Sequence, residues 1–301
     1  MKAEPIQART AVKAGEPAGA AGVDRPGYDA LAAEFRYVIT DMICRAGSGH
    51  LGGALSLVEI AITLYYRVMN IRPRAPRWPD RDRLVVSKGH AGPVIYAALA
   101  YRGFFPRSWL STLNADGTRL PSHMDMRQTP GVDMTAGSLG QGLSCACGIA
   151  LAARRDNRSC TTYCIIGDGE SNEGQIWEAA LFAAHNRMDN LVAICDYNKL
   201  QIDGFTRDVL ELEPLADKWR AFGWAVFETD GHDWDSVYDT LMAAKAVRGK
   251  PAMIIAHTIK GKGNVVVENM PESHNVKVPD SEAYERYMNG LAAQGFALPY
   301  E

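Results

Sequence analysis

Two side chains suited to binding a divalent cation, Asp168 and Asn198, each follow a short apolar segment of the chain. Residues 160–166 and 190–195 are rich in apolar, β-branched and thiol side chains, as buried parallel strands are, and Gly167 ends the first segment. Ligands bind at the carboxyl ends of such strands, where the following helix also points its amide groups at an anion. Magnesium prefers oxygen ligands and leaves positions for phosphate oxygens. The pattern therefore predicts a magnesium diphosphate site on Asp168 and Asn198.

The Gly-Asp-Gly sequence at 167–169 is also a common turn, so this motif alone is a weak signal. The segments that follow this motif change the interpretation. An apolar strand, an acid-bearing turn, a helical segment over 173–187 and a second strand before Asn198 together resemble the diphosphate-binding signature of thiamine diphosphate enzymes. Residues 173–180, Glu-Gly-Gln-Ile-Trp-Glu-Ala-Ala, and 188–191, Met-Asp-Asn-Leu, resemble the transketolase family's version of it.

Other segments resemble further transketolase motifs, in the family's order. Residues 46–53 with His50 resemble the first histidine motif, residues 86–91 with His90 resemble the second, and His123 lies where the family has a third. Residues 133–142 match a cofactor-contacting loop, and residues 259–274 resemble the segment that closes the cofactor domain. Because these motifs occur in register over about residues 28–280, coincidence is a poor explanation, and the resemblance covers most of the chain.

The resemblance implies that the chain binds thiamine diphosphate with Mg²⁺ or Ca²⁺ and takes part in cleaving a carbon–carbon bond next to a ketone. Such cleavage leaves electron density that no side chain can accept, whereas the cofactor's thiazolium can. By resemblance, the metal ligands are Asp168, Asn198 and the backbone carbonyl of Leu200. The residues implied to contact the cofactor are His90, Gly137, Leu139, Gly169, Asn198, Ile202 and His274.

Histidine side chains suit proton transfer near neutral pH and hydrogen bonding to sugar hydroxyls. By resemblance, His50 and His90 face the donor's carbonyl and hydroxyl groups, and His123 contacts hydroxyls near C1, although its flanking residues depart from the family's usual Gly-His-Pro. Glu173 matches an acid that communicates with a glutamate of a partner subunit; it is equally an acid favoured by a helix dipole. Lys260 could neutralise phosphate or lie in a solvated turn.

A chain of 301 residues accommodates about one large α/β domain with tails. A full transketolase adds a pyrimidine-binding domain and a C-terminal domain, so this chain resembles the N-terminal subunit of a split transketolase. In such enzymes the glutamate that hydrogen-bonds the aminopyrimidine comes from the other domain, and no segment here supplies it. We therefore expect a partner subunit with the pyrimidine-binding domain, an α2β2 assembly, sugar phosphates as substrates and no activity from this chain alone.

The composition argues against several other classes of protein. A net charge of −3 with 22% charged residues gives no basic excess that would indicate a nucleic-acid partner. The apolar stretches, such as 60–66, are too short for a membrane span, and the N-terminus has no apolar signal core, so we expect a cytoplasmic protein. Among six cysteines, Cys145 and Cys147 lack zinc-site spacing, and we expect buried free thiols.

The alternation of expected strands and helices predicts an α/β fold, a doubly wound parallel sheet with helices on both faces. Residues 1–25, rich in Ala, Gly and Pro, are expected to form a flexible arm, and residues 26–301 a single diphosphate-binding domain. We expect one helix to start at Tyr28 and a second to cover 56–69 with Ser56 as its cap. Further helices are expected over 141–154, 173–187 and 234–247. The expected strands are 83–87, 160–166, 190–195, 224–227 and 252–257.

Two other functions remain open. A thiamine-dependent 2-oxo acid dehydrogenase or decarboxylase component shares the metal motif, but it needs no set of three histidine motifs. A non-catalytic paralogue that regulates a partner would not need Asp168, Asn198 and the histidines intact. The donor ketose stays undetermined, because the arginines that grip its phosphate in transketolases lie largely in the half of the enzyme that the resemblance does not cover.

Overall fold

The computed structural model of the chain describes residues 25–202 and 204–292. The first described element is the helix α1 (Arg25–Arg45). The flexible arm expected for residues 1–25 therefore lies, apart from Arg25, outside the described residues and stays a prediction. Within the described ranges, no helix is both long and apolar enough to cross a membrane.

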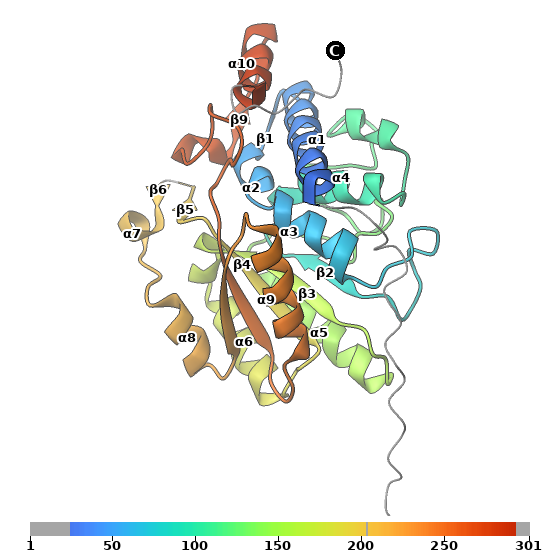
Figure 1. The fold of residues 1–301 in the computed structure, drawn as a ribbon, viewed down its shortest axis with the longest axis vertical. Helices are drawn as coiled ribbons and strands as arrows, with labels where there is room; N and C mark the ends of the chain where they lie inside the picture. The colour runs from blue at the N-terminus through green and yellow to red at the C-terminus, as the bar shows by residue number, and fades with distance from the viewer. Residues whose placement is uncertain (1–24, 203, 293–301) are drawn as a thin grey trace, which may run out of the picture.

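A five-stranded sheet forms the centre of the fold, and its strands run in the order β2-β3-β4-β8-β7 (Figure 1). Every neighbouring pair is parallel, so the expected parallel α/β sheet is confirmed. The strand β8 lies between β4 and β7, so the last two strands stand in the sheet in the reverse of their order in the sequence. The strands are β2 (Arg83–Val86), β3 (Thr162–Gly167), β4 (Leu191–Tyr197), β7 (Ala225–Asp230) and β8 (Ala252–His257).

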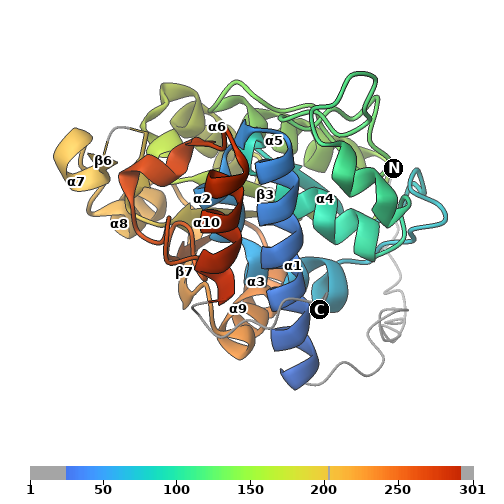
Figure 2. The same ribbon diagram turned by 90° about the horizontal axis from the view of Figure 1, so that it is seen from above.

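Helices cover both faces of this sheet, as Figures 1 and 2 show. Side chains of successive strand residues point to opposite faces, so Tyr163 and Ile165 of β3 pack in one core and Cys164 and Ile166 in the other. The first core includes residues of α1, α3 (Val58–Thr63), α4 (Gly92–Tyr101) and α9 (Trp234–Ala246). The second includes residues of α5 (Gln141–Arg155), α6 (Gly174–His185) and α8 (Leu215–Ala221).

Shorter elements connect these layers and bring distant segments together. The two-residue strands β1 (Ser48–Gly49) and β9 (Val276–Lys277) pair antiparallel, which joins the residues before His50 to those after His274. Figure 2 shows α10 (Ser281–Ala292) beside α1, where the Tyr284 hydroxyl donates to Asp41 at 2.6 Å. The other elements are α2 (Leu51–Leu55), η1 (Leu64–Val68), η2 (Gly89–Ala91), η3 (Arg107–Thr112), η4 (Gly169–Asn172), β5 (Leu200–Gln201), β6 (Gly204–Phe205), α7 (Thr206–Val209) and η5 (Pro271–His274).

Two expectations from the sequence were wrong in detail. The helix expected over 56–69 is divided into α3 and η1, and Ser56 does not cap it. The Ser56 hydroxyl instead donates to Asp196 at 2.6 Å, and Glu59 pairs with Arg36. Both side chains are thus bound to buried partners elsewhere in the chain and not to each other's backbone. All six cysteines are free, but Cys145 is exposed rather than buried.

Candidate active site

The order of the strands places the two predicted cation ligands together. Gly167 of β3 lies opposite Asp196 of β4, so Asp168 and Asn198 emerge at the same edge of the sheet. A cleft of about 310 Å³ opens at this edge. Most of the residues singled out in the sequence line it, namely His90, Leu139, Asp168, Gly169, Glu173, Asn198, Leu200, Ile202 and His274.

Asp168 is a buried carboxylate in an environment that suits a cation. It accepts hydrogen bonds from the backbone amides of Gly169, at 2.7 Å, and Lys199. Burial, and then the negative charge of Asp196, raise the pKa of Asp168 to about 7. A cation bound here would offset both effects, so the carboxylate fits a metal ligand.

The rest of the donor set suits a hard cation held by few protein groups. The Asn198 side-chain oxygen accepts from the Leu200 amide at 3.1 Å, beside Asp168. In the described part of the chain, no group of three or more His, Cys, Asp or Glu side chains is arranged to hold a metal ion. A cation at Asp168 would therefore depend on amide, carbonyl and ligand oxygens, which is the coordination that Mg²⁺ adopts with bound phosphates.

The same cleft contains donors that suit an anion. The side-chain NH₂ groups of Asn172 and Gln201 are buried there without an acceptor among the described residues, which is costly unless a ligand supplies one. A Cβ added to Gly169 would lie 2.6 Å from the Gln201 Cβ, so only glycine fits at this close approach. The Lys260 ammonium lies 3.5 Å from His274 Nδ1, and burial, followed by the charge of Lys88, lowers the pKa of Lys260 to about 8. A diphosphate fits these groups.

Four histidine rings from four separate segments form a cluster, and two of them, His90 and His274, line this cleft. The ring centre of His50 lies 5.1 Å from that of His90, 5.6 Å from that of His123 and 5.0 Å from that of His274. Burial lowers the pKa of His50 and of His274 to about 4, with smaller contributions from neighbouring histidine and lysine charges. Burial and the Lys88 charge also hold the pKa of His90 well below its ordinary value. These three imidazoles are therefore neutral at pH 7 and able to donate or accept one hydrogen bond at each nitrogen.

A buried ion pair beneath the cleft was missed in the sequence. Lys88 lines the cleft, contacts the Asp196 carboxylate and donates to the Gly53 carbonyl at 3.2 Å. Asp196 in turn accepts from Ser56 and Thr258. The signal was present, since Lys88 belongs to the second histidine motif and Asp196 precedes Asn198 by two residues, but the pairing joins segments 108 residues apart.

Glu170 is a second residue without an assigned role in the sequence. Its buried carboxylate accepts from the backbone amides of Gly140 at 2.7 Å and Gly167 at 2.9 Å, and from the Ser87 hydroxyl. These contacts tie together the segment after β2, the end of β3 and the start of α5. Glu170 thereby holds in place the loop that carries Leu139.

The remaining predicted residues lie at the rim of the cleft. A Cβ added to Gly137 would lie 3.7 Å from the His123 ring, so this glycine adjoins the histidine cluster. Glu173 is exposed and occupies the N-cap position of α6 without a side-chain capping bond. Ile202 is 60% exposed. The placement of all three is compatible with the sequence-based roles, which stay predictions.

The chain matches known proteins over nearly its whole length. Residues 28–301 match the model of the family described as transketolase, thiamine diphosphate binding domain. A Clostridium protein named 6-deoxy-6-sulfo-D-fructose transketolase subunit SqwG is 56% identical over 81% of this chain and 89% of its own. A protein of Actinobacillus succinogenes, named as a subunit of apulose-4-phosphate transketolase, is 44% identical over 81% of this chain and 87% of its own.

Solved structures give the same assignment. The transketolase of Campylobacter jejuni superposes with a TM-score of 0.84 at 30% identity, over 92% of this chain and 45% of that one. The transketolase of Leishmania mexicana gives a TM-score of 0.82 at 30% identity, over 91% of this chain and 43% of that one. The chain thus spans less than half the length of these solved transketolases. It belongs to the transketolase family and has that family's thiamine diphosphate binding domain.

Proposed function

We propose that this chain is the N-terminal subunit of a two-chain transketolase that moves a two-carbon ketol unit from a ketose to an aldose phosphate. The observation that supports this most directly is the cleft lined by the buried Asp168, by Asn172 and Gln201 with unsatisfied side-chain NH₂ groups, and by His90 and His274. Beside it, His50 and His123 complete the histidine cluster. Relatives that this chain covers to 87–89% of their length are named transketolase subunits, which supports a partner subunit. We infer an α2β2 assembly in the cytoplasm.

In this proposal, Asp168, Asn198 and the Leu200 carbonyl hold Mg²⁺ or Ca²⁺, while Gly169, His274 and Lys260 contact the diphosphate. Thiamine diphosphate, when bound, supplies the electron acceptor for carbon–carbon bond cleavage. Leu139 and Ile202 would pack against its rings, and Gly137 would contact it through the backbone. Glu173, exposed beside the cleft, would meet the partner subunit.

The histidines would act on the sugar. Because burial keeps the pKa of His50 near 4 and that of His90 lower than usual, each presents a neutral ring that can bind a hydroxyl and accept its proton. His123, 5.6 Å from His50, would bind the hydroxyl groups nearest to the reacting carbonyl. Together the rings would orient the ketose and transfer protons as the bond breaks and forms.

The donor is proposed to be a ketose with an anionic group at the far end. Two relatives are named for such sugars, one with a sulfonate and one with a phosphate, and the relative at 56% identity makes 6-deoxy-6-sulfo-D-fructose the first candidate.

The test is ketol transfer by the chain co-purified with the pyrimidine-domain protein encoded beside it, in the presence of thiamine diphosphate and Mg²⁺. The donors are 6-deoxy-6-sulfo-D-fructose, apulose 4-phosphate and xylulose 5-phosphate, with an aldose phosphate as acceptor and mass spectrometry of the products. We expect transfer from at least one donor and its loss in His90→Ala. Cofactor-loaded complex that transfers from none of the three would contradict the proposed function.

A further inference from the structure

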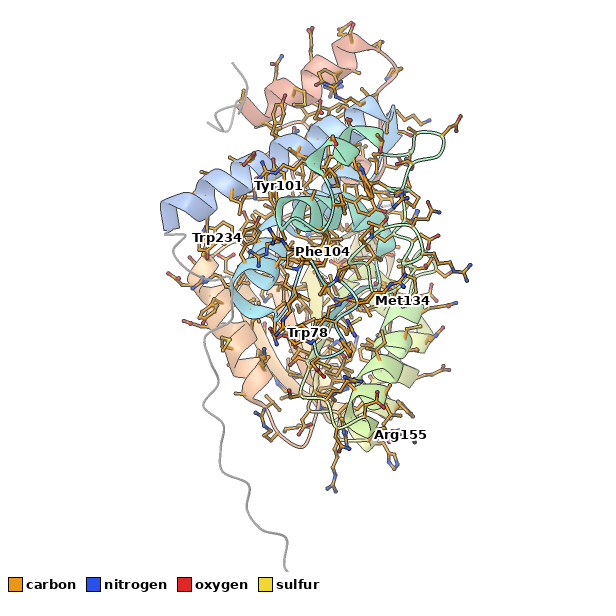
Figure 3. All side chains as sticks on the ribbon, turned by 90° about the vertical axis from the view of Figure 1, so that its right-hand side faces the viewer. Trp78, Tyr101, Phe104, Met134, Arg155 and Trp234 are labelled. Carbon is orange, nitrogen blue, oxygen red and sulfur yellow. The ribbon has the colours of Figure 1, made fainter. Side chains whose placement is uncertain are left out.

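A second cavity, larger than the cofactor cleft, lies beside the edge strand β2. It has a volume of about 770 Å³, within the range of small-molecule sites. Its wall comes mostly from the segment that enters β2 and from residues 126–133, which lead into the loop over 133–142 proposed to contact the cofactor. Figure 3 looks onto this side of the molecule and labels Trp78, on the first of these segments, and Met134, directly after the second.

The charge of this cavity is unusual for the chain. Five arginines line it, together with one acid, Asp133, which gives a local charge of +4 in a protein whose net charge is −3. The arginines are Arg77, Arg81, Arg83, Arg119 and Arg127. Concentrated like charge in a concave surface raises the local concentration of counter-ions.

Asp133 is already committed to structural contacts. Its carboxylate forms a two-point contact with the buried Arg81 and accepts the backbone amide of Leu84 at 2.9 Å. Arg83 reaches the same carboxylate only at 3.8 Å, and burial and the charge of Arg81 lower the pKa of Arg83. The Asp133 carboxylate therefore neutralises the charge of Arg81, and the positive charges of the remaining guanidinium groups stay available to a ligand.

The other three arginines form no side-chain ion pair among the described residues, although the Asp125 carboxylate accepts the Arg127 backbone amide at 2.8 Å. This hydrogen bond and, in smaller part, the charge of Arg127 lower the pKa of Asp125. Arg77 and Arg127 are exposed, and no described side chain forms an ion pair with either. Arg119 lies over the Trp109 ring at 5.1 Å, which orients its guanidinium without neutralising it. Planar guanidinium forks of this kind match phosphate oxygens in pairs.

The cavity also has an apolar side. Met126, Pro130, Val132 and Ile149 line it together with the arginines. A ligand with several phosphate groups and an organic part would thus find partners for both.

The position of the cavity connects it to the histidine cluster. The loop over residues 125–135 closes on itself where the Ala136 amide donates to the Met124 carbonyl at 3.1 Å. His123 and Gly137 directly flank this closure, and Asp133, near the end of the loop, holds it on Arg81. One loop therefore contributes to both the cavity and the active site.

We propose that the arginine cavity is a binding site for a small polyanion, a metabolite with two or more linked phosphate groups, separate from the thiamine diphosphate cleft. The ligand bridges the arginines of the β2 entry segment and those of the 119–127 segment. It thereby restrains the loop that leads to His123 and Gly137.

The test uses the full chain saturated with thiamine diphosphate and Mg²⁺, so that the cofactor cleft is filled. Inorganic phosphate, tripolyphosphate and ATP are titrated by calorimetry at two salt concentrations. We expect tripolyphosphate to bind more tightly than phosphate and more weakly as salt rises. If ATP binds as tightly as tripolyphosphate, the site recognises the phosphates alone. If ATP binds more tightly, the apolar side of the cavity also contacts the ligand.

Two matched variants locate the site. Arg77→Gln/Arg127→Gln removes two cavity charges, and Arg155→Gln/Arg286→Gln removes two exposed charges elsewhere, on α5 and α10. We expect the first to weaken tripolyphosphate binding by about tenfold or more, and the second by less than about twofold, as lost charge-assisted hydrogen bonds predict. Tripolyphosphate should also slow amide hydrogen exchange over 125–135 in the wild type. Absence of binding, or equal weakening in both variants, would overturn the proposal.

Discussion

At the scale of single residues, several side chains of the cleft have pKa values displaced from their ordinary values. Lys260 is buried, and its ammonium lies 3.5 Å from the His274 ring. The charges of Asp168 and Asp196 act on Lys260 without a direct ion pair among the described residues. Burial lowers the pKa of Lys260 to about 8, so the group changes charge within an accessible pH range. A bound diphosphate favours the charged form and raises this pKa again. Protonation and cofactor binding are therefore linked through Lys260.

This linkage predicts a pH dependence with a definite sign. Affinity for thiamine diphosphate should be highest between about pH 7, where Asp168 ionises, and pH 8. It should fall as the pH rises through 8, because the free chain then loses the Lys260 proton that the complex retains. Lys260→Met should bind roughly tenfold more weakly at pH 7 and lack this fall. Calorimetry from pH 6.5 to about 9.5 checks both.

The neighbouring lysine provides the control. Lys262 is one third exposed and pairs with Glu268 at 3.6 Å, outside the cleft lining. Lys262→Met should retain the wild-type pH profile. If Lys260→Met shows the same profile as the wild type, Lys260 does not contact the diphosphate.

Asp168 carries a second prediction at this scale. Its carboxylate is 2% exposed and has a pKa raised to about 7, so the metal-free chain holds an uncompensated acid. Asp168→Ala should abolish Mg²⁺-dependent retention of thiamine diphosphate while leaving the fold intact, since its hydrogen-bond donors Gly169 and Lys199 are partly solvent-accessible. Equilibrium dialysis with and without Mg²⁺, beside circular dichroism, measures both. Unchanged cofactor affinity would refute the metal assignment.

At the scale of elements, helix α5 shows how the sheet is fitted to the site. It is rich in Ala, Gly and Cys, and its first turn lies against the segment after β2. A Cβ added to Gly142 would lie 2.4 Å from the Ser87 Cβ, whereas one added to Gly148 would meet nothing within 4 Å. The close contact with Ser87 therefore leaves no room for a side chain at Gly142, whereas Gly148 has room for one.

Alanine substitution separates them. Gly148→Ala should stabilise the isolated chain by about 0.5–1 kcal/mol, since alanine loses less backbone freedom in a helix. Gly142→Ala should destabilise it by roughly 1–3 kcal/mol despite the same gain, because Ser87 must move. Urea unfolding of the two variants gives both values. Equal stabilisation in both variants would show that the contact with Ser87 does not constrain α5.

The regular elements could be predicted from sequence because their signals are local. The strand expected over 252–257 coincides with β8, and the helix expected from 141 begins α5 at Gln141. Ser56 failed as a cap because Asp196, 140 residues away, accepts its hydroxyl. Local pattern indicates an element, but a buried distant partner can change where the element starts.

At the scale of the whole molecule, motif recognition located the cleft, and parallel-strand topology explains why it is one site. Asp168 and Asn198 could be predicted as neighbours because strand ends meet at one edge. The contact between Lys88 and Asp196 and the arginine cavity could not, since each joins segments whose proximity depends on the packed fold. The resemblance named Asp168 and the histidines but gave no role to Glu170, which holds the Gly140 loop.

The central claim is that this chain supplies one part of a composite active site. The most direct measurement titrates a fixed amount of the chain with its purified pyrimidine-domain partner, in excess thiamine diphosphate and Mg²⁺, and follows ketol transfer. The account predicts no turnover by either protein alone and a linear rise that levels off at one partner per chain. Turnover by this chain without the partner would contradict it.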